Sequence, residues 1–308
     1  ALHWKNKDNV CAVISISAGA FGILKYKKMF SNAKFIMQAH GTSVGELASK
    51  LKTRKIKKIL SSAKNILGFY SDAKHYSYFD WVVAVGDAVR SDLTNFPTRL
   101  ICDTNKVVKI ENGIDEHLFS DDTSQKNKLR EALSISSSSL VFLSASRLHE
   151  QKGVDKNIEL FAKIKISKPD SKLIICGNGP HEPHLRRKVD ELKLVQDVIF
   201  MGAKKRSELA HLMQCADIFL FLTKRIEGLP LNVLEAMSAG LPLIISEHLT
   251  FAAGEKIFKC KPNEIAVDEA LGYINKVSDQ KRKSYIPVGN TLSYAVSEYI
   301  SLFQRSSK

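Results

Sequence analysis

The second half of the chain alternates short, continuous apolar runs with longer amphipathic segments. Short apolar runs bounded by polar residues predict buried strands, and apolar residues three and four apart predict helices. From residue 140 this pattern predicts strands at 140–145, 173–176, 198–201, 217–222 and 243–246, and helices at 154–166, 183–194, 207–214 and 230–239. Strands that alternate with helices at this pitch imply a parallel, doubly wound α/β sheet, whose ligands bind at the carboxyl ends of the strands.

The first part of the chain has the same alternation. It predicts strands at 10–16, 34–39, 81–85 and 106–110, with one helix around 21–30 and another after residue 86. Residues 119–139 are polar around a short helical piece at 126–133, so we place a domain boundary there and expect domains at 1–120 and 121–290. The segment 247–263 is expected to be irregular. Apolar residues at helical spacing predict a C-terminal helix within 291–308, with Leu292, Ala295, Val296, Tyr299, Ile300 and Phe303 on its apolar side.

The helix predicted at 230–239 is apolar on nearly every side, which is typical of a buried helix. Pro230 suits its first turn, where a missing N–H is not needed. The polar residues Asn232, Glu235 and Ser238 are three apart and form one narrow stripe. A buried carboxylate on such a stripe is unfavourable by several kcal/mol unless something hydrogen-bonds to it. We infer that a ligand could supply those hydrogen bonds.

The segment just before this helix is compatible with the same ligand. Gly228 allows close approach of another molecule, and the free N–H groups of the first helical turn attract anions such as phosphate. Glu227 and Glu235 flank this anion site and suit hydroxyl groups, which a nucleotide-sugar carries on both sides of its diphosphate. A loop followed by a core helix with one partly solvated glutamate explains the same spacing.

Composition indicates a soluble globular protein, with 44% hydrophobic and 25% charged residues. No apolar run approaches the roughly 18 residues of a membrane span, and the first residues do not resemble a signal peptide. Five scattered cysteines without metal spacing favour reduced thiols in the cytoplasm. The net charge of +14 indicates an acidic partner, which nucleic acid, anionic lipid or a phosphate-bearing substrate could each provide.

A basic amphipathic helix is predicted at residues 46–67. Its apolar stripe is interleaved with Lys50, Lys52, Arg54, Lys55, Lys57, Lys58 and Lys64. The segment Lys50–Lys64 is therefore a candidate for contact with an anionic membrane surface, where each basic residue contributes about 1 kcal/mol. The solvated face of an ordinary helix has the same pattern. No recognised nucleic-acid-binding motif is present, so nucleic acid is not the expected partner.

The segment E-G-L-P-L-N-V-L-E-A-M-S-A-G-L-P, residues 227–242, resembles the nucleotide-sugar signature of the retaining GT-B glycosyltransferases of family four. The resemblance implies that Glu227 contacts the transferred sugar and that Glu235 holds the ribose. It implies a GT-B fold, in which two Rossmann-like domains face a cleft and the C-terminal helix crosses back to the N-terminal, acceptor-side domain. The family's earliest strand and glycine-rich acceptor loop have no match here, so we expect a short or truncated N-terminal lobe: either the chain is a fragment or its acceptor side is minimal.

The same resemblance extends to several loops that follow predicted strands. Arg147 and Lys152 match an R-x4-K-G segment and would neutralise the leaving diphosphate, while His40 matches a histidine near the outer hydroxyl of the transferred sugar. A histidine after a strand is also common as a structural residue, and G-N-G-P at 177–180 is also an ordinary turn. The positions assigned to nucleotide binding are Gly177, Gly179, Gly202, Gly228, Leu229, Leu231, Asn232 and Glu235.

These inferences favour a retaining hexosyltransferase that uses a nucleoside-diphosphate sugar, with a UDP-sugar preferred. The acceptor would be a glycan or lipid-linked molecule in surface polysaccharide or glycolipid synthesis, reached at the inner face of the membrane. Arg147 and Lys152 would take the role of a divalent metal, so no metal or other cofactor is expected; His181 and His184 lack a third ligand. The alternative is a non-catalytic protein that binds a nucleotide or nucleic acid.

Overall fold

A computed structural model describes residues 10–30, 32–44, 63–225, 229–264, 266–278 and 280–305. The chain divides into two compact units, one made of Ala1–Gly113 with Leu292–Lys308 and the other of Ile114–Thr291. We expected the second unit to begin at residue 121. It begins earlier, at Ile114, because Ile114 and Phe119 are buried in its core. Local polarity could not reveal this, since both residues lie in a loop-like segment of the sequence.

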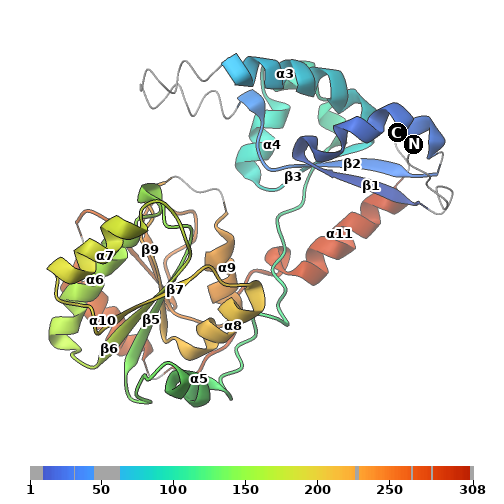
Figure 1. The fold of residues 1–308 in the computed structure, drawn as a ribbon. Helices are drawn as coiled ribbons and strands as arrows, with labels where there is room; N and C mark the ends of the chain where they lie inside the picture. Colours follow the sequence, from blue (N-terminus) through green and yellow to red (C-terminus); the bar gives the residue numbers. More distant parts are fainter. Residues whose placement is uncertain are drawn as a thin grey trace. The chain divides into compact units, whose positions relative to one another are not determined.

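The first unit contains a parallel sheet of four strands in the order β1-β2-β3-β4 (Figure 1). Its strands are β1 (Ala12–Ile16), β2 (Lys34–Ala39), β3 (Trp81–Ala84) and β4 (Val107–Lys109). All four strands were predicted, with small differences at their ends. Buried apolar side chains alternate along β2, so that Phe35 and Met37 point to one face and Ile36 points to the other.

Different elements cover the two faces of this sheet. Apolar residues of η2 (Ser17–Met29), η3 (Tyr76–Tyr78) and α4 (Asp87–Thr94) pack on the face that contains Phe35. The opposite face is covered by α11 (Leu292–Gln304), whose Ala295 and Leu302 pack against Ile36. The prediction that the C-terminal helix returns to the first domain is therefore confirmed. The segment predicted as an ordinary helix at 21–30 is instead a 3-10 helix that starts earlier, at Ser17.

The described part of the first unit also contains α3 (Ala63–His75), η4 (Thr98–Leu100) and η5 (Thr104–Lys106). Helix α3 continues past residue 67, where the predicted basic helix was expected to end. Residues 45–62, and with them most of the segment Lys50–Lys64, lie outside the described part of the chain. The membrane-binding role of that segment therefore stays a prediction.

The second unit contains a parallel sheet of six strands in the order β10-β9-β8-β5-β6-β7. The strands are β5 (Leu140–Ala145), β6 (Ser171–Cys176), β7 (Val198–Gly202), β8 (Ile218–Phe221), β9 (Leu243–Ser246) and β10 (Ile257–Cys260). The predicted doubly wound sheet is confirmed. The prediction of an irregular segment at 247–263 is wrong, because β10 pairs in parallel with β9. This strand has only four residues, and Lys259 interrupts its apolar run, so its sequence pattern is too short to be recognised.

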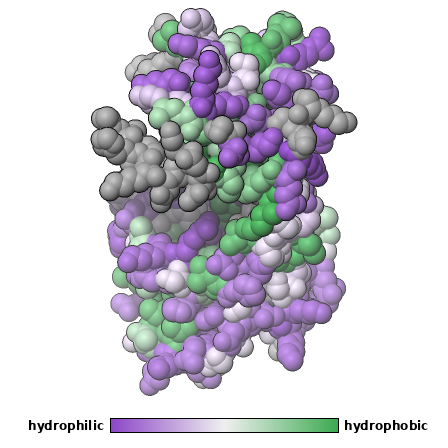
Figure 2. Space-filling view, turned by 90° about the vertical axis from the view of Figure 1, so that its right-hand side faces the viewer, coloured by the Kyte–Doolittle hydropathy of each residue, from purple (hydrophilic) through white to green (hydrophobic). Residues whose placement is uncertain are grey.

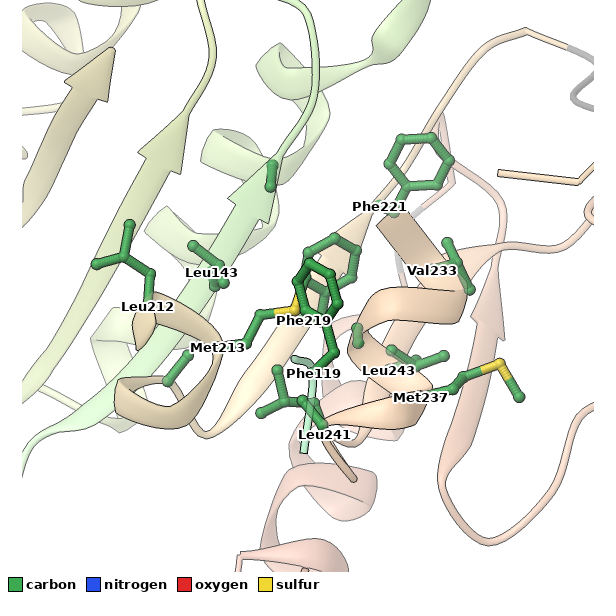
Figure 3. Close-up of a cluster of buried hydrophobic side chains, with 14 of the residues drawn as sticks. Phe119, Leu143, Leu212, Met213, Phe219, Phe221, Val233, Met237, Leu241 and Leu243 are labelled. Carbon is green, nitrogen blue, oxygen red and sulfur yellow. The ribbon is translucent and has the colours of Figure 1, made fainter. Parts of the chain in front are cut away.

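Helices cover both faces of this sheet (Figure 1). One face is packed by α6 (Val154–Ser167), α7 (Glu182–Glu191) and α10 (Val267–Val277), the last of which the sequence analysis did not assign. The other face is packed by α5 (Lys126–Ala132), α8 (Arg206–Cys215) and α9 (Leu231–Ser238). Figure 3 shows Met213 of α8 and Val233 of α9 on either side of Phe219 from β8. The 3-10 turns η6 (Glu150–Lys152) and η7 (Val288–Asn290) complete the unit.

The strand order places a switch point between β5 and β8. Strands β5, β6 and β7 follow one another outward in one direction, and β8, β9 and β10 follow one another in the other. Loops that leave the carboxyl ends of β5 and β8 therefore diverge, and ligands of open α/β sheets bind in the crevice that this creates. On the face drawn in Figure 2, hydrophilic residues are interspersed with smaller hydrophobic areas.

Candidate functional site

A buried asparagine holds the two strands of the switch point together. The side-chain amide of Asn157 donates to the hydroxyl of Ser144 at 2.8 Å and to the carbonyl of Leu220 at 3.3 Å. Its side-chain oxygen accepts from the amide of Leu222 at 3.0 Å. Because a buried amide with satisfied donors and acceptor is rigid, Asn157 fixes β5 against β8 just below the loops that carry the candidate site.

The loops after β5, β6 and β7 are fastened to one another by main-chain hydrogen bonds. The amide of Leu148 donates to the carbonyl of Asn178 at 2.9 Å, and the amide of Gly177 donates to the carbonyl of Gly202 at 2.8 Å. Gly177 has a φ of +134°, and a Cβ there would lie 1.8 Å from the carbonyl oxygen of Ser146. Gly177 is therefore required for loop packing, in addition to any role in admitting a nucleotide.

A pocket of about 270 Å³ lies at the carboxyl ends of β5, β6 and β8. It is lined by Arg147, Leu148, His149, Gln151, Lys152, Asn178, Gly179, Pro180 and Arg225. The lining contains three basic side chains, those of Arg147, Lys152 and Arg225, and no carboxylate, so the pocket has the electrostatic character of an anion site. The sequence-predicted residues Arg147, Lys152 and Gly179 are brought together here.

Arg225 belongs to this pocket, although the sequence analysis did not single it out. Its neighbour Lys224 points elsewhere and forms an ion pair with the buried carboxylate of Asp155, at 2.8 Å from Nζ to Oδ2. The amide of Arg225 donates to the hydroxyl of Thr223 at 3.1 Å, which shapes the turn after β8. One feature of the sequence could have indicated Arg225: it belongs to a pair of basic residues that comes directly after a predicted strand and just before Glu227.

Glu235 of α9 is a nearly buried carboxylate, and its side chain is only 7% exposed. Among the described residues, Arg206 forms an ion pair with Glu235, at 3.6 Å from Nε to Oε1, and no hydrogen bond reaches either carboxylate oxygen. Burial raises the pKa of Glu235 to about 7, and the positive charge of Arg206 acts in the opposite direction. A buried carboxylate without hydrogen-bond partners from the protein is suited to accept hydrogen bonds from a ligand.

The other polar residues of the predicted stripe have different surroundings. The amide of Asn232 donates to the carbonyl of Ala145 at 2.7 Å, so this side chain fastens α9 to the end of β5. The hydroxyl of Ser238 is buried and has no hydrogen-bond partner among the described residues. Leu229 and Leu231 are partly buried against the core. Contacts of Asn232 and these leucines with a nucleotide therefore stay predictions.

Several predicted positions lie away from this pocket or outside the described residues. Glu227 and Gly228 are outside the described part of the chain, directly after Arg225 and Ile226. His40 belongs to the first unit, where it is exposed at the end of β2. Within the described ranges, no group of three or more His, Cys, Asp and Glu side chains is arranged to hold a metal ion. No helix in those ranges is long and apolar enough to cross a membrane.

The chain matches a known protein family over more than half of its length. Residues 125–283 match the family described as "Glycosyl transferases group 1". The N-acetyl-alpha-D-glucosaminyl L-malate synthase of Bacillus anthracis is 31% identical over 158 residues, which are 51% of this chain and 40% of that relative. The alpha-monoglucosyldiacylglycerol synthase of Acholeplasma laidlawii is 31% identical over 130 residues, which are 42% of this chain and 32% of that protein. The matched part thus spans two fifths or less of these relatives.

Similarity to solved structures extends over both units. HepE of Anabaena in complex with UDP and glucose aligns with a TM-score of 0.64 at 18% identity, covering 95% of this chain and 75% of that one. The fold is therefore the GT-B fold, with two parallel α/β sheets and a C-terminal helix that packs on the first. Because the family match includes the cationic pocket and Glu235, this chain belongs to the glycosyl transferases group 1 family.

Proposed function

We propose that this protein is a retaining glycosyltransferase that moves a hexose from a nucleoside-diphosphate sugar, preferably a UDP-sugar, to a hydroxyl group of its acceptor. The observation that carries the proposal is a pocket with three basic side chains and no carboxylate, together with a helix that is fastened to the end of β5 and carries a buried carboxylate. A diphosphate fits the first feature, and ribose hydroxyls fit the second. The Anabaena protein was solved with UDP and glucose, which supports a UDP-sugar as donor.

The cations of the pocket would act mainly on the leaving group. When the bond between the sugar and the diphosphate breaks, negative charge grows on the diphosphate oxygens. Arg147, Lys152 and Arg225 line the pocket at fixed positions on loops that the sheet holds in place. Charges that are already oriented need no reorganisation during the reaction, and such electrostatic stabilisation is often the largest contribution to catalysis. Glu227, which precedes α9, would contact the transferred sugar.

The acceptor is proposed to be a glycan or a lipid-linked molecule in surface polysaccharide or glycolipid synthesis. The Acholeplasma relative is named as a glycolipid synthase, which supports a lipid-linked acceptor. The exposed His40 of the first unit is the residue that we assign to the outer hydroxyl of the transferred sugar. We propose the acceptor-side role of this unit from the family resemblance and not from its local geometry.

Direct binding of nucleotides tests this function. We expect UDP or GDP to raise the melting temperature of the protein, and the matching nucleotide-sugar to be hydrolysed slowly to the free nucleoside diphosphate even without an acceptor. The release should persist in EDTA, because the pocket supplies its own cations. Absence of stabilisation by every nucleoside diphosphate would contradict the proposal, as would release that vanishes in EDTA and returns with manganese.

We also propose that Lys50–Lys64 docks the protein on anionic lipid at the inner face of the membrane. Replacing Lys52, Lys55 and Lys58 by serine should lower affinity for phosphatidylglycerol vesicles by roughly two orders of magnitude, since each charge contributes about 1 kcal/mol. Vesicle co-sedimentation measures this, with neutral phosphatidylcholine vesicles as the control. Equal sedimentation of parent and variant with anionic vesicles would show that the segment is an ordinary solvated surface.

A further inference from the structure

Helices α8 and α9 cover the same face of the six-stranded sheet, and a side chain at the start of α8 reaches a carboxylate in the middle of α9. Met213 of α8 and Val233 of α9 both belong to the buried cluster around Phe219 (Figure 3). Arg206 begins α8, and its Nε lies 3.6 Å from Oε1 of Glu235 in α9. The side chain of Arg206 is 56% exposed, whereas that of Glu235 is 7% exposed. An exposed cation therefore reaches a carboxylate that is otherwise enclosed.

Among the described residues, Arg206 is the charged group that acts on Glu235. Strands β8 and β9, on which α9 packs, contain only uncharged residues. The free energy of ionising Glu235 is therefore a balance between two effects, namely burial, which raises its pKa, and Arg206, which lowers it. The resulting pKa of about 7 lies in the range where many enzymes work.

The protonation state of Glu235 matters for its proposed ligand. An ionised carboxylate accepts hydrogen bonds at both oxygens and can hold two neighbouring hydroxyl groups. The protonated acid carries a donor at one oxygen and is a weaker acceptor, so it holds the same pair less well. A group that favours ionisation of Glu235 therefore favours ribose binding.

We propose that Arg206 is a positioning residue of the donor site, which pairs with the Glu235 carboxylate and keeps it available to the ribose hydroxyls through neutral pH. This inference rests on the proposed function and adds to it a residue and a pH dependence. The direction follows from the charge. In the parent, affinity for nucleoside diphosphate falls as pH drops through about 7, because Glu235 becomes protonated. Without Arg206 the same loss occurs at higher pH.

The experiment compares the parent with Arg206→Met, Arg206→Lys and Lys205→Met by titration calorimetry with UDP and with GDP from pH 6 to pH 9. Lys205 is exposed and adjacent, so its replacement removes the same charge without removing the ion pair. We expect Arg206→Met to raise the pKa of Glu235 by about one unit, which weakens binding about tenfold near pH 6 and about threefold near pH 7.5, and to approach the parent at pH 9. Arg206→Lys should recover part of the loss, and Lys205→Met should follow the parent.

A second measurement reports on Glu235 without any ligand. Carboxyl resonances of glutamate labelled with carbon-13 should show one group that titrates near neutral pH, disappears in Glu235→Gln and moves to higher pH in Arg206→Met. A loss of affinity by the same factor at every pH, or an unshifted carboxyl titration, would overturn the role of Arg206. Failure of the parent to bind UDP or GDP would instead overturn the donor site itself, which separates the two proposals.

Discussion

Replacing Arg147 and Lys152 together by alanine is expected to lower kcat for release of the nucleoside diphosphate from the donor roughly 10³-fold, while KM changes much less. Both residues line the same pocket, and the third cation there, Arg225, remains. Removing a single preorganised group that stabilises transition-state charge typically lowers kcat about 10²- to 10³-fold. The two effects should not multiply fully, because both groups act on one leaving diphosphate.

Initial rates of nucleoside diphosphate release, measured over a range of donor concentrations, separate kcat from KM in this variant. The matched control is Lys128→Ala with Lys163→Ala, which removes two charges from exposed positions on α5 and α6. It should leave kcat within a factor of about two and should unfold at the parent's temperature, since surface changes usually alter stability by less than about 0.5 kcal/mol. A kcat for the pocket variant within tenfold of the parent would contradict the role of these cations.

Glu235→Gln is expected to stabilise the free protein at pH 8 and to weaken UDP binding. Both effects arise because the substitution removes a buried negative charge. Burial raises the pKa of Glu235 from an ordinary 4.5 to about 7, so between these values the folded protein holds a proton that the unfolded chain has lost. Stability is therefore lost as pH rises through this window. At pH 8 the carboxylate is charged and buried, and a neutral glutamine removes a cost of about 1 to 3 kcal/mol.

Denaturant unfolding at pH 8 and pH 4.5 checks the first effect, and UDP titration at pH 8 checks the second. The stabilisation should be largest at pH 8 and should be small at pH 4.5, where the folded parent is protonated at this position and the unfolded chain is half protonated. UDP affinity should fall roughly 10- to 100-fold, because charge-assisted hydrogen bonds to ribose are lost. The exposed Glu131→Gln serves as control; equal stability of Glu235→Gln and parent at both pH values would contradict the account.

The sequence alone determined most of the strands and the helices between them. Runs such as 140–145 and 243–246 are buried on both faces of a parallel sheet, so they are apolar except for one serine each and are easy to recognise. The positions of Arg147, Lys152 and Gly179 directly after strands were equally informative, because the carboxyl ends of parallel strands share one edge. The family resemblance of residues 227–242 then supplied roles that spacing could not.

Tertiary structure decided what depends on contacts between distant segments. Strand β10 is a strand because β9 pairs with it, and Arg225 lines the pocket because the turn after β8 lies beside η6. The need for glycine at 177 arises from the carbonyl of Ser146, which lies on another strand's loop. The pKa of Glu235 depends on burial beneath its neighbours and on Arg206, which is far away in the sequence. Local patterns record what each segment prefers, whereas these features exist only once the sheet has brought the segments together.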